Sequence, residues 1–416
     1  MVWSEISSRP RHRSKNDGAI EKVNVSTDYA MEAFLSKRAS DSGFDIGSRL
    51  IEMSRRISDV ISLGRGDPDL PTPAHIVAAA KLAMDAGHTH YTALGGLDSL
   101  KQAIATKLKR DNRLDVDADN EVLITTGAQE AMVVAILCLL DPGDEIILPD
   151  PYYFSYEYAI RYAGGNLVTV PTSAASGFAP DPDDIARAIT ARTKAIVLLT
   201  PNNPTGAVYP RAILERIAEV SLSRGIPVVS DELYETSVFG ATEHFSIASV
   251  PGMRDRTITI NGFSKSYRMT GWRIGYMVGP PGFVTSAQKI KQTLTICAPS
   301  ISQHAAVAAL DGPQDCIQEA LDIYAERRGA FLRGLDEIGI PYFHPAGTFY
   351  VFADITSVGM DSNELCLKLL EDARVFVYPG SQFGPAGDGY VRISLLAPTP
   401  HLIEGLNRIG RFLAQR

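Results

Sequence analysis

The sequence has little cysteine and no long apolar segment. Its four cysteines form no C-x-x-C pair, so they offer neither a disulfide framework nor a cysteine metal site. They are Cys138, Cys297, Cys316 and Cys366. A reduced, cytoplasmic protein fits this usage best. The longest strongly apolar run, AMVVAILCLL at residues 131–140, is about half the length that spans a bilayer and is predicted to be a buried helix.

Basic residues are fewer than acidic residues. Lysine and arginine total 40 against 48 acidic residues, giving a formal net charge of −8, which argues against nucleic acid as the main partner. The 416 residues are 45% hydrophobic and 21% charged, as in a soluble globular protein of two domains. The N-terminal stretch SSRPRHRSKNDG lacks the apolar core of a secretory signal. We predict a flexible N-terminal arm over residues 1–45.

Between about residues 75 and 290, helix-like and strand-like segments alternate. This pattern predicts an α/β fold with a mostly parallel sheet covered by helices. The run RAILERIAEVSLSRG at 211–225 illustrates it, with one apolar helix face, a terminal glycine and the buried-strand run IPVVS directly after it. After about residue 295 the pattern changes to a long helix and short strands. We therefore predict a large domain over 73–295 and a smaller α+β domain formed by 46–72 with 296–416.

Several predicted strands of the large domain end in polar, aromatic or glycine-rich residues. In open α/β sheets, ligands bind outside the carboxyl ends of the parallel strands. Polar strand ends therefore meet at one edge of the sheet. The sequence predicts a single small-molecule site there, which gathers Gln129, Tyr153, Asn203, Asp231, Tyr234 and Lys265.

Lys265 follows a β-branched run in the segment NGFSKSYRMTGWRIGY. A lysine attacks carbonyl groups when burial or a cationic neighbour lowers its pKa, although a lysine after a strand is ordinarily just exposed. The neighbours of Lys265 meet the needs of pyridoxal phosphate, which requires a lysine for a Schiff base and a carboxylate beside its pyridinium nitrogen. Asp231 is the best-placed acid, because alternation along the strand points Glu232 the other way.

The other parts of such a site also have candidates. The run TTGAQEAMVVAILCLL passes from a strand through glycine into a helix, whose free N–H groups and dipole can hold a phosphate. Arg273 offers a guanidinium fork for the same dianion. Tyr153 or Tyr152 could stack on the cofactor ring. Asn203 and Tyr234 could donate hydrogen bonds to its oxygen.

A series of further motifs surrounds these residues: YTALGGL, TTGAQEA, DPYYFSY, PNNPTGAVY, SDELYE, SKSYRMTGWRIGY, GTFYVF and VRISL. In their order and approximate spacing, the chain from about residue 63 to 413 resembles the class I (fold type I) pyridoxal-phosphate-dependent aminotransferases. The resemblance implies ping-pong transamination, in which an amino acid gives its amino group to the cofactor and a 2-oxo acid takes it back.

The resemblance implies a role for each matched residue. Lys265 would form the Schiff base and then move the substrate proton. Asp231 would pair with the pyridine nitrogen, Tyr153 would stack on the ring, and Asn203 and Tyr234 would bind the phenolic oxygen. Lys265, Asp231 and Tyr234 are thus the expected catalytic residues. The implied phosphate ligands are Ala128, Gln129, Ser264 and Arg273.

The resemblance also implies how the substrate and a second subunit bind. Arg392 would grip the substrate α-carboxylate in a bidentate pair, helped by Asn203 and the backbone of Gly66. Tyr91 would reach the phosphate of the neighbouring subunit. The resemblance therefore implies a homodimer with shared active sites whose small-molecule substrates are an amino acid and a 2-oxo acid. From charge and hydropathy we expect no nucleic acid or membrane partner.

The pocket for the substrate side chain departs from part of the family. Some members that favour dicarboxylates have a lysine after the phosphate-loop glycines, where this chain has Gln129. That difference argues against simple aspartate specificity. Arg65 is a possible replacement cation, but we favour the alternative that its side chain points away from the site or pairs with an acid.

Other interpretations stay open at this stage. A β-eliminating C–S lyase or related synthase would use the same scaffold and cofactor. A pyridoxal-phosphate-sensing regulator would need an N-terminal DNA-binding domain, for which the residues before the match are too few. His88 and His90 flank Thr89 at a spacing that can suggest a metal site. No carboxylate or cysteine ligand accompanies them in the sequence, so we predict no metal site.

Overall fold

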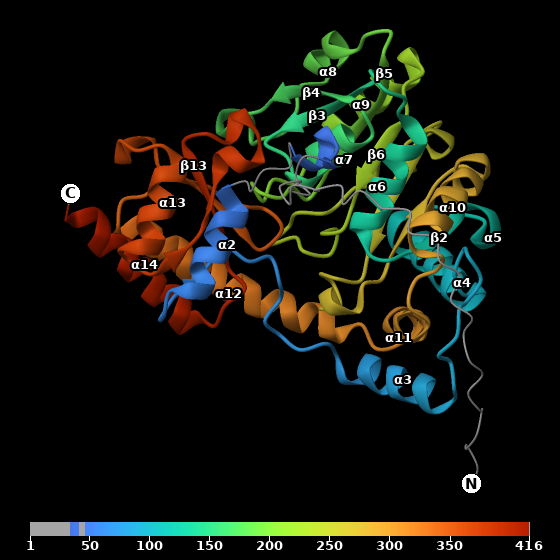
Figure 1. The fold of residues 1–416 in the computed structure, drawn as a ribbon, viewed down its shortest axis with the longest axis horizontal. Helices are drawn as coiled ribbons and strands as arrows, with labels where there is room; N and C mark the ends of the chain where they lie inside the picture. Colours follow the sequence, from blue (N-terminus) through green and yellow to red (C-terminus); the bar gives the residue numbers. More distant parts are fainter. Residues whose placement is uncertain (1–33, 41–45, 416) are drawn as a thin grey trace, which may run out of the picture. The chain divides into compact units, whose positions relative to one another are not determined.

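The computed structural model describes residues 34–40 and 46–415 (Figure 1). The chain divides into two units, Met1–Gly43 and Phe44–Arg416. Of the first unit, only residues 34–40 are described, including the short helix α1 (Lys37–Ser40). Most of the arm predicted over residues 1–45 thus lies outside the described residues.

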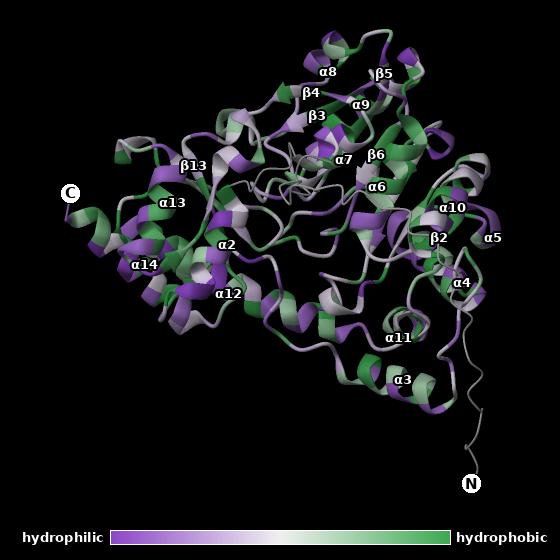
Figure 2. Ribbon diagram, viewed as in Figure 1, coloured by the Kyte–Doolittle hydropathy of each residue, from purple (hydrophilic) through white to green (hydrophobic). Residues whose placement is uncertain are grey.

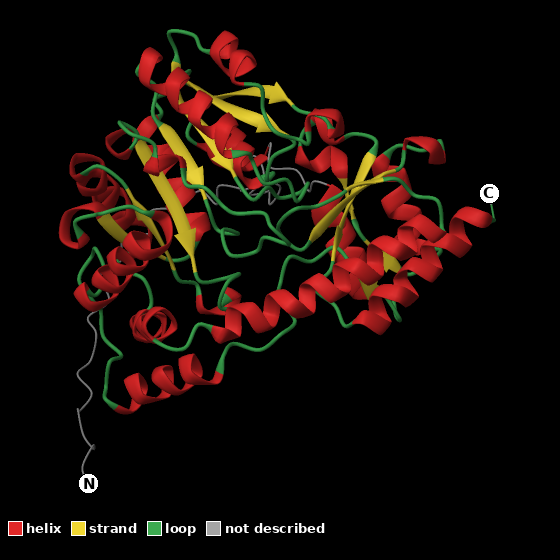
Figure 3. Cartoon of the chain, turned by 180° about the vertical axis from the view of Figure 1, so that it is seen from behind, coloured by secondary structure: helices red, strands yellow, loops and turns green. Residues whose placement is uncertain are grey.

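A seven-stranded sheet dominates the second unit (Figure 3). Its strand order is β2-β8-β7-β6-β5-β3-β4. The strands are β2 (Val122–Thr125), β3 (Glu145–Asp150), β4 (Asn166–Pro171), β5 (Thr193–Leu199), β6 (Val228–Asp231), β7 (Thr257–Gly262) and β8 (Gly275–Val278). Strands β3 to β7 pair in parallel, and only β8 runs against its neighbours. The predicted α/β fold with a mostly parallel sheet is confirmed.

Helices cover both faces of this sheet, and α3 (Ala74–Asp85) joins them by packing against α11 (Ser300–Asp311). The others are α4 (Asp98–Lys107), α5 (Ala118–Glu121), α6 (Ala128–Leu139), α7 (Ser155–Tyr162), α8 (Pro182–Ala188), α9 (Arg211–Arg224) and α10 (Pro281–Thr295). Alternate residues of β5 belong to opposite cores: Ala195 and Val197 pack with α6, whereas Ile196 and Leu198 pack with α9. Because both faces are buried, the strand is a continuous apolar run.

Two of these helices match the sequence closely. Helix α9 follows the predicted run and stops at Gly225, which adopts a left-handed conformation with φ of +70°. The apolar run at 131–140 lies in α6, whose inner residues are buried and which is largely green in Figure 2. No helix in the described part of the chain is long and apolar enough to cross a membrane.

A smaller, four-stranded antiparallel sheet has the order β12-β13-β10-β9. Its strands are β9 (Tyr342–Phe343), β10 (Tyr350–Asp354), β12 (Tyr378–Pro379) and β13 (Tyr390–Ser394). The remaining helices are α2 (Ile46–Arg56), α12 (Asp315–Glu337), α13 (Ser362–Glu371) and α14 (Thr399–Ala414). Strand β1 (Ile61–Ser62) pairs in parallel with β11 (Val375–Phe376), which joins the start of the unit to its C-terminal part. The domain boundaries stay a prediction, since residues 44–416 form one compact unit.

Candidate active site

The carboxyl ends of the parallel strands open onto a cavity of about 600 Å³. Its lining includes every predicted site residue except Tyr91, which lies outside it and is 79% exposed. The predicted residues brought together are Gly66, Ala128, Gln129, Tyr153, Asn203, Asp231, Tyr234, Ser264, Lys265, Arg273 and Arg392. Tyr152 is absent from the lining and instead donates a hydrogen bond to Glu157 at 2.9 Å. Of the two tyrosines considered for ring stacking, only Tyr153 faces the cavity.

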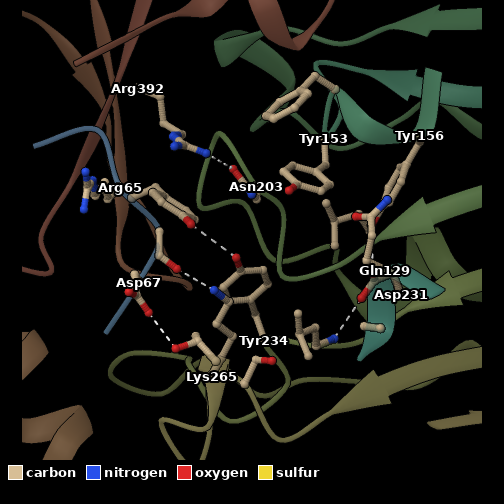
Figure 4. A pocket seen from close by; sticks show the side chains of 18 of the residues that line it. Arg65, Asp67, Gln129, Tyr153, Tyr156, Asn203, Asp231, Tyr234, Lys265 and Arg392 are labelled. Atoms are coloured by element: carbon tan, nitrogen blue, oxygen red, sulfur yellow. Dashed lines mark hydrogen bonds between the residues drawn. The ribbon is translucent and has the colours of Figure 1, made fainter. Parts of the chain in front are cut away.

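Lys265 lies on the turn that follows β7. Its Nζ donates a short hydrogen bond to the carbonyl oxygen of Gly66 (Figure 4). Burial lowers the pKa of Lys265 to about 8; Asp67 acts to raise it, and Arg392 and Arg273 add to the lowering. The neutral amine that a carbonyl nucleophile requires therefore appears from about pH 8, well below the pH at which an exposed lysine loses its proton.

Asp231 is the last residue of β6, and its carboxylate is buried at the floor of the cavity. Its Oδ1 accepts from the backbone N–H of Leu233 at 3.0 Å, and its Oδ2 accepts a short hydrogen bond from Tyr156. Burial raises the pKa of Asp231 to about 6, although both hydrogen bonds act to lower it. Glu232 is turned away from the cavity, as the strand alternation predicts, and accepts from Ser246 at 2.7 Å.

Arg392 extends from β13 across the opposite wall. Its Nη1 donates to Asn203 at 2.9 Å and its Nη2 donates to the carbonyl oxygen of Gly64 at 2.6 Å. Its Nε is buried and has no hydrogen-bond partner within the described part of the chain. The guanidinium lies 4.3 to 4.9 Å from the centres of three aromatic rings, Tyr350, Tyr378 and Phe383. A buried cation with a spare donor beside a cavity is suited to a carboxylate.

The start of α6 forms an anion cradle. Gly127 precedes the helix with φ of +84°, and no side chain caps the helix N-terminus. A Cβ at Gly127 would lie 2.6 Å from Nη2 of Arg273, and a Cβ at Gly275 would lie 2.7 Å from the backbone nitrogen of Ala128. Only glycine permits this close approach. The first N–H groups of α6, Arg273 and the buried Ser264 thus face one anion-sized space.

Aromatic side chains form the remaining walls. The hydroxyl of Tyr234 lies 3.3 Å from that of Tyr350. The ring of Tyr153 meets the edge of Tyr156, with centroids 5.5 Å apart. Gln129 donates to Ser155 at 2.5 Å, which holds its amide against α7. Arg65 lines the mouth of the cavity, but its guanidinium extends away from Lys265 (Figure 4).

Sequence reasoning missed Asp67, Tyr156 and Tyr350 as lining residues. Asp67 accepts from Thr270 at 2.6 Å, which ties the segment before α3 to the turn after Lys265. Its signal was available in the glycine- and proline-rich run GRGDPD, which cannot continue a helix or strand. Tyr156 follows Tyr153 at helical spacing, so both can face the same side.

Potential metal-ligating side chains lie elsewhere. His88 stacks on His304 with ring centroids 4.1 Å apart. In the described part of the chain, one group of three such side chains occurs, Glu232, Glu235 and His244. The carboxylate oxygens of this group already accept hydrogen bonds from protein donors: Lys107, Asn112, Ser230, Ser246, His244 and Asn261.

The chain is similar to known aminotransferases in both sequence and structure. Residues 58–408 match the family model described as aminotransferase class I and II. The chain is 38% identical to an aspartate aminotransferase of Pyrococcus abyssi over 370 residues, covering 88% of this chain and 95% of the relative. It is 37% identical to aromatic-amino-acid aminotransferase 2 of Thermococcus litoralis, with the same coverage. The solved structure of Thermus thermophilus aspartate aminotransferase with maleate is similar at a TM-score of 0.86 and 37% identity, covering 91% of this chain and 99% of that one.

Proposed function

The chain belongs to the class I and II aminotransferases, and we propose that the cavity around Lys265 is where it carries out transamination. Its family, fold, transaminase activity and dependence on pyridoxal phosphate agree with the sequence-based expectations. The observation that carries the proposal is the meeting of a buried lysine, a buried carboxylate and a helix N-terminus in one cavity.

The residues present fit pyridoxal phosphate. Gly275 lets β8 approach the start of α6, and Gly127 makes room for the Arg273 guanidinium beside a helix N-terminus that no side chain caps. Phosphate would be held there by the backbone of Ala128 and Gln129, with Ser264 and Arg273. When bound, the cofactor supplies an electron sink that stabilises negative charge at the substrate Cα.

The other polar groups orient the ring. Asp231 would keep the pyridine nitrogen protonated, because a buried carboxylate gains most from a positive partner. Asn203 and Tyr234 would donate to the phenolic oxygen, and Tyr153 would cover one face. Lys265 would hold the cofactor covalently. Once a substrate amine has displaced it, its neutral Nζ would take the proton from Cα of the substrate and deliver it to C4′ of the cofactor.

Arg392 binds the α-carboxylate of the amino acid in this scheme. Its unpaired Nε and the aromatic rings around it leave one polar edge of the guanidinium for a planar anion. Asn203 fixes the orientation of that guanidinium, and the backbone at Gly66 lies beside the bound substrate. The carboxylate would thus be held on one wall and the reacting Cα above Lys265.

We further propose a homodimer in which Tyr91 completes the partner's phosphate site. Tyr91 is 79% exposed and outside the cavity of its own chain, so a role in catalysis requires a second subunit. Mixing a Lys265→Ala variant with a Tyr91→Ala variant tests this, because hybrid dimers regain one intact site. Recovered activity supports the shared site, and no recovery from a mixed dimer contradicts it.

The four free cysteines support a reducing, cytoplasmic location. Fusion of a redox-sensitive fluorescent reporter to the chain, followed in its own cells, measures the compartment directly. A reduced signal in the cytoplasm is the expected result. An oxidised signal at the cell envelope would contradict it.

A panel of amino donors with pyruvate and 2-oxoglutarate as acceptors tests the function. Aspartate and the aromatic amino acids belong in the panel, because relatives carry those names. We expect stoichiometric formation of a 2-oxo acid and a new amino acid without release of ammonia. Ammonia release in place of amino transfer would favour the β-eliminating lyase instead.

A further inference from the structure

Asp231 depends on two donors that the proposed chemistry does not itself use. The backbone N–H of Leu233, two residues on, donates to its Oδ1 at 3.0 Å, and the hydroxyl of Tyr156 donates to its Oδ2. The first donor is local. The second comes from helix α7, 75 residues away in the sequence. Each carboxylate oxygen therefore has one lone pair occupied and one remaining.

Tyr156 is held firmly in this position. It lies in the first turn of α7, its side chain is 2% exposed, and its ring packs edge-on against Tyr153 with centroids 5.5 Å apart. Burial, followed by the charge of Asp231, raises its pKa well above the ordinary tyrosine value. The hydroxyl therefore stays protonated and acts only as a donor toward the carboxylate.

The charged and titratable groups that face Asp231 come from several elements. Glu232 on the same strand acts to raise the pKa of Asp231, and Lys265 on the turn after β7 acts to lower it. The charge of Asp231 also acts to raise the pKa of Tyr153, which lies in the segment before α7. Burial is the largest influence and favours the neutral acid, whereas Tyr156 is the largest influence that favours the carboxylate.

We propose that Tyr156 is a positioning residue that keeps Asp231 ionised beside the ring nitrogen of the cofactor. The inference rests on the proposed pairing of Asp231 with that nitrogen. A neutral Asp231 cannot hold the nitrogen protonated, so the electron sink weakens. Tyr156 thus acts on the reaction through Asp231, without touching substrate.

The test follows the binding of pyridoxal phosphate to cofactor-free protein from about pH 5 to about pH 9, a range that spans the titration of Asp231. The dissociation constant is measured by fluorescence titration for wild type, Tyr156→Phe, Asp231→Asn and the double variant. Tyr152→Phe is the matched control: this neighbouring buried tyrosine also donates to a carboxylate, but to Glu157.

In the wild type, affinity falls on the acid side as Asp231 takes up a proton. Tyr156→Phe removes a donor to the carboxylate, so the midpoint of that fall moves upward by about one pH unit or more. Tyr152→Phe keeps the wild-type midpoint. Asp231→Asn removes the part of the fall near pH 6 and leaves the part near pH 8 that comes from protonation of Lys265. Tyr156→Phe then adds no further change in that background.

High pH supplies an internal check on folding. Well above the shifted midpoint, Tyr156→Phe regains wild-type affinity if its only effect is on ionisation. Weaker binding at every pH, an unchanged midpoint, or an equal effect in the Asp231→Asn background overturns the inference. If Asp231→Asn itself binds with the wild-type pH profile, the role proposed for Asp231 fails instead, so the two failures are distinguishable.

Discussion

Asp231 and Glu232 are adjacent in the sequence but belong to two different polar clusters. Asp231 faces the cavity that contains Lys265 and Arg392. Glu232 points into a second cluster on the other side of the strand, where Glu235 accepts from Lys107 and Asn261. Each cluster contains a buried carboxylate and a buried cation. They differ in how completely their charged groups are satisfied.

In the second cluster, each oxygen of Glu232 and Glu235 accepts at least one hydrogen bond from the protein. Such a network stabilises the fold, and breaking it leaves a charge buried without a partner. In the first cluster, Arg392 keeps an unpaired Nε and Lys265 contacts only a backbone carbonyl among the hydrogen bonds of the described chain. The comparison teaches that unsatisfied cations beside a cavity, rather than buried charge as such, identify the site.

Replacing one lysine from each cluster gives the largest expected contrast. Lys265→Ala should abolish transamination without a loss of stability in the cofactor-free protein, because burial already disfavours the charge of Lys265. Lys107→Ala should instead cost about 3–5 kcal/mol of stability, because it leaves Glu235 buried and unpaired. Steady-state turnover and urea unfolding measure the two effects. Full activity in Lys265→Ala would remove the basis for the comparison.

Arg392→Ala should lower kcat/KM for amino acids by about 10²-fold or more, since it removes the cationic partner of a desolvated carboxylate. Affinity for pyridoxal phosphate should persist. The control is Arg192→Ala, which breaks the ion pair between Arg192 and Glu145. The Arg192 side chain is 65% exposed, so this change should alter kcat/KM little. Loss of the cofactor from Arg392→Ala would show that the two binding roles are misassigned.

Isosteric amides at the two adjacent acids sharpen the contrast. Asp231→Asn should reduce kcat strongly with a small change in stability, because burial disfavours its charge. Glu232→Gln should lower stability by about 1–3 kcal/mol, because its amide keeps one acceptor oxygen where the carboxylate accepts from three donors on two oxygens. Measurements of kcat and of the unfolding free energy for both variants test these two expectations. The reverse pattern would mean that the two side chains were assigned to the wrong clusters.

The lowered pKa of Lys265, about 8, predicts a pH effect. Cofactor-free protein should capture pyridoxal phosphate faster as pH rises through about 8, where the neutral amine appears. Folding lowers this pKa, so the unfolded chain holds the proton more tightly. The stability of the cofactor-free protein should therefore rise between about pH 8 and about pH 10. Lys265→Met should abolish both trends, and a capture midpoint near the ordinary lysine value would contradict the burial argument.

Arg65→Ala should have the smallest effect. Its guanidinium extends away from Lys265, so kcat/KM for aspartate relative to an aromatic donor should change by no more than about threefold, a difference below about 1 kcal/mol. The ratio is measured with both donors under the same conditions. A large loss confined to dicarboxylates would show that Arg65 turns inward to bind them.

The sheet and its polar edge were predictable from sequence because each buried strand is an apolar run that ends abruptly. The opposite directions of Asp231 and Glu232 follow from the alternation of side chains along a strand. The contact between Tyr156 and Asp231 was not predictable, because it joins α7 to β6 through tertiary packing. The aromatic wall around Arg392 likewise depends on how β10 and β12 pair with β13. Local patterns do not encode that register.

Reduction with borohydride in the presence of pyridoxal phosphate, followed by peptide mapping, tests the central claim most directly. The reagent fixes the cofactor to the lysine that bears it. The account predicts a single modified peptide that carries the label on Lys265, with Lys107 unmodified. Label on Lys107, or on any lysine other than Lys265, would contradict it.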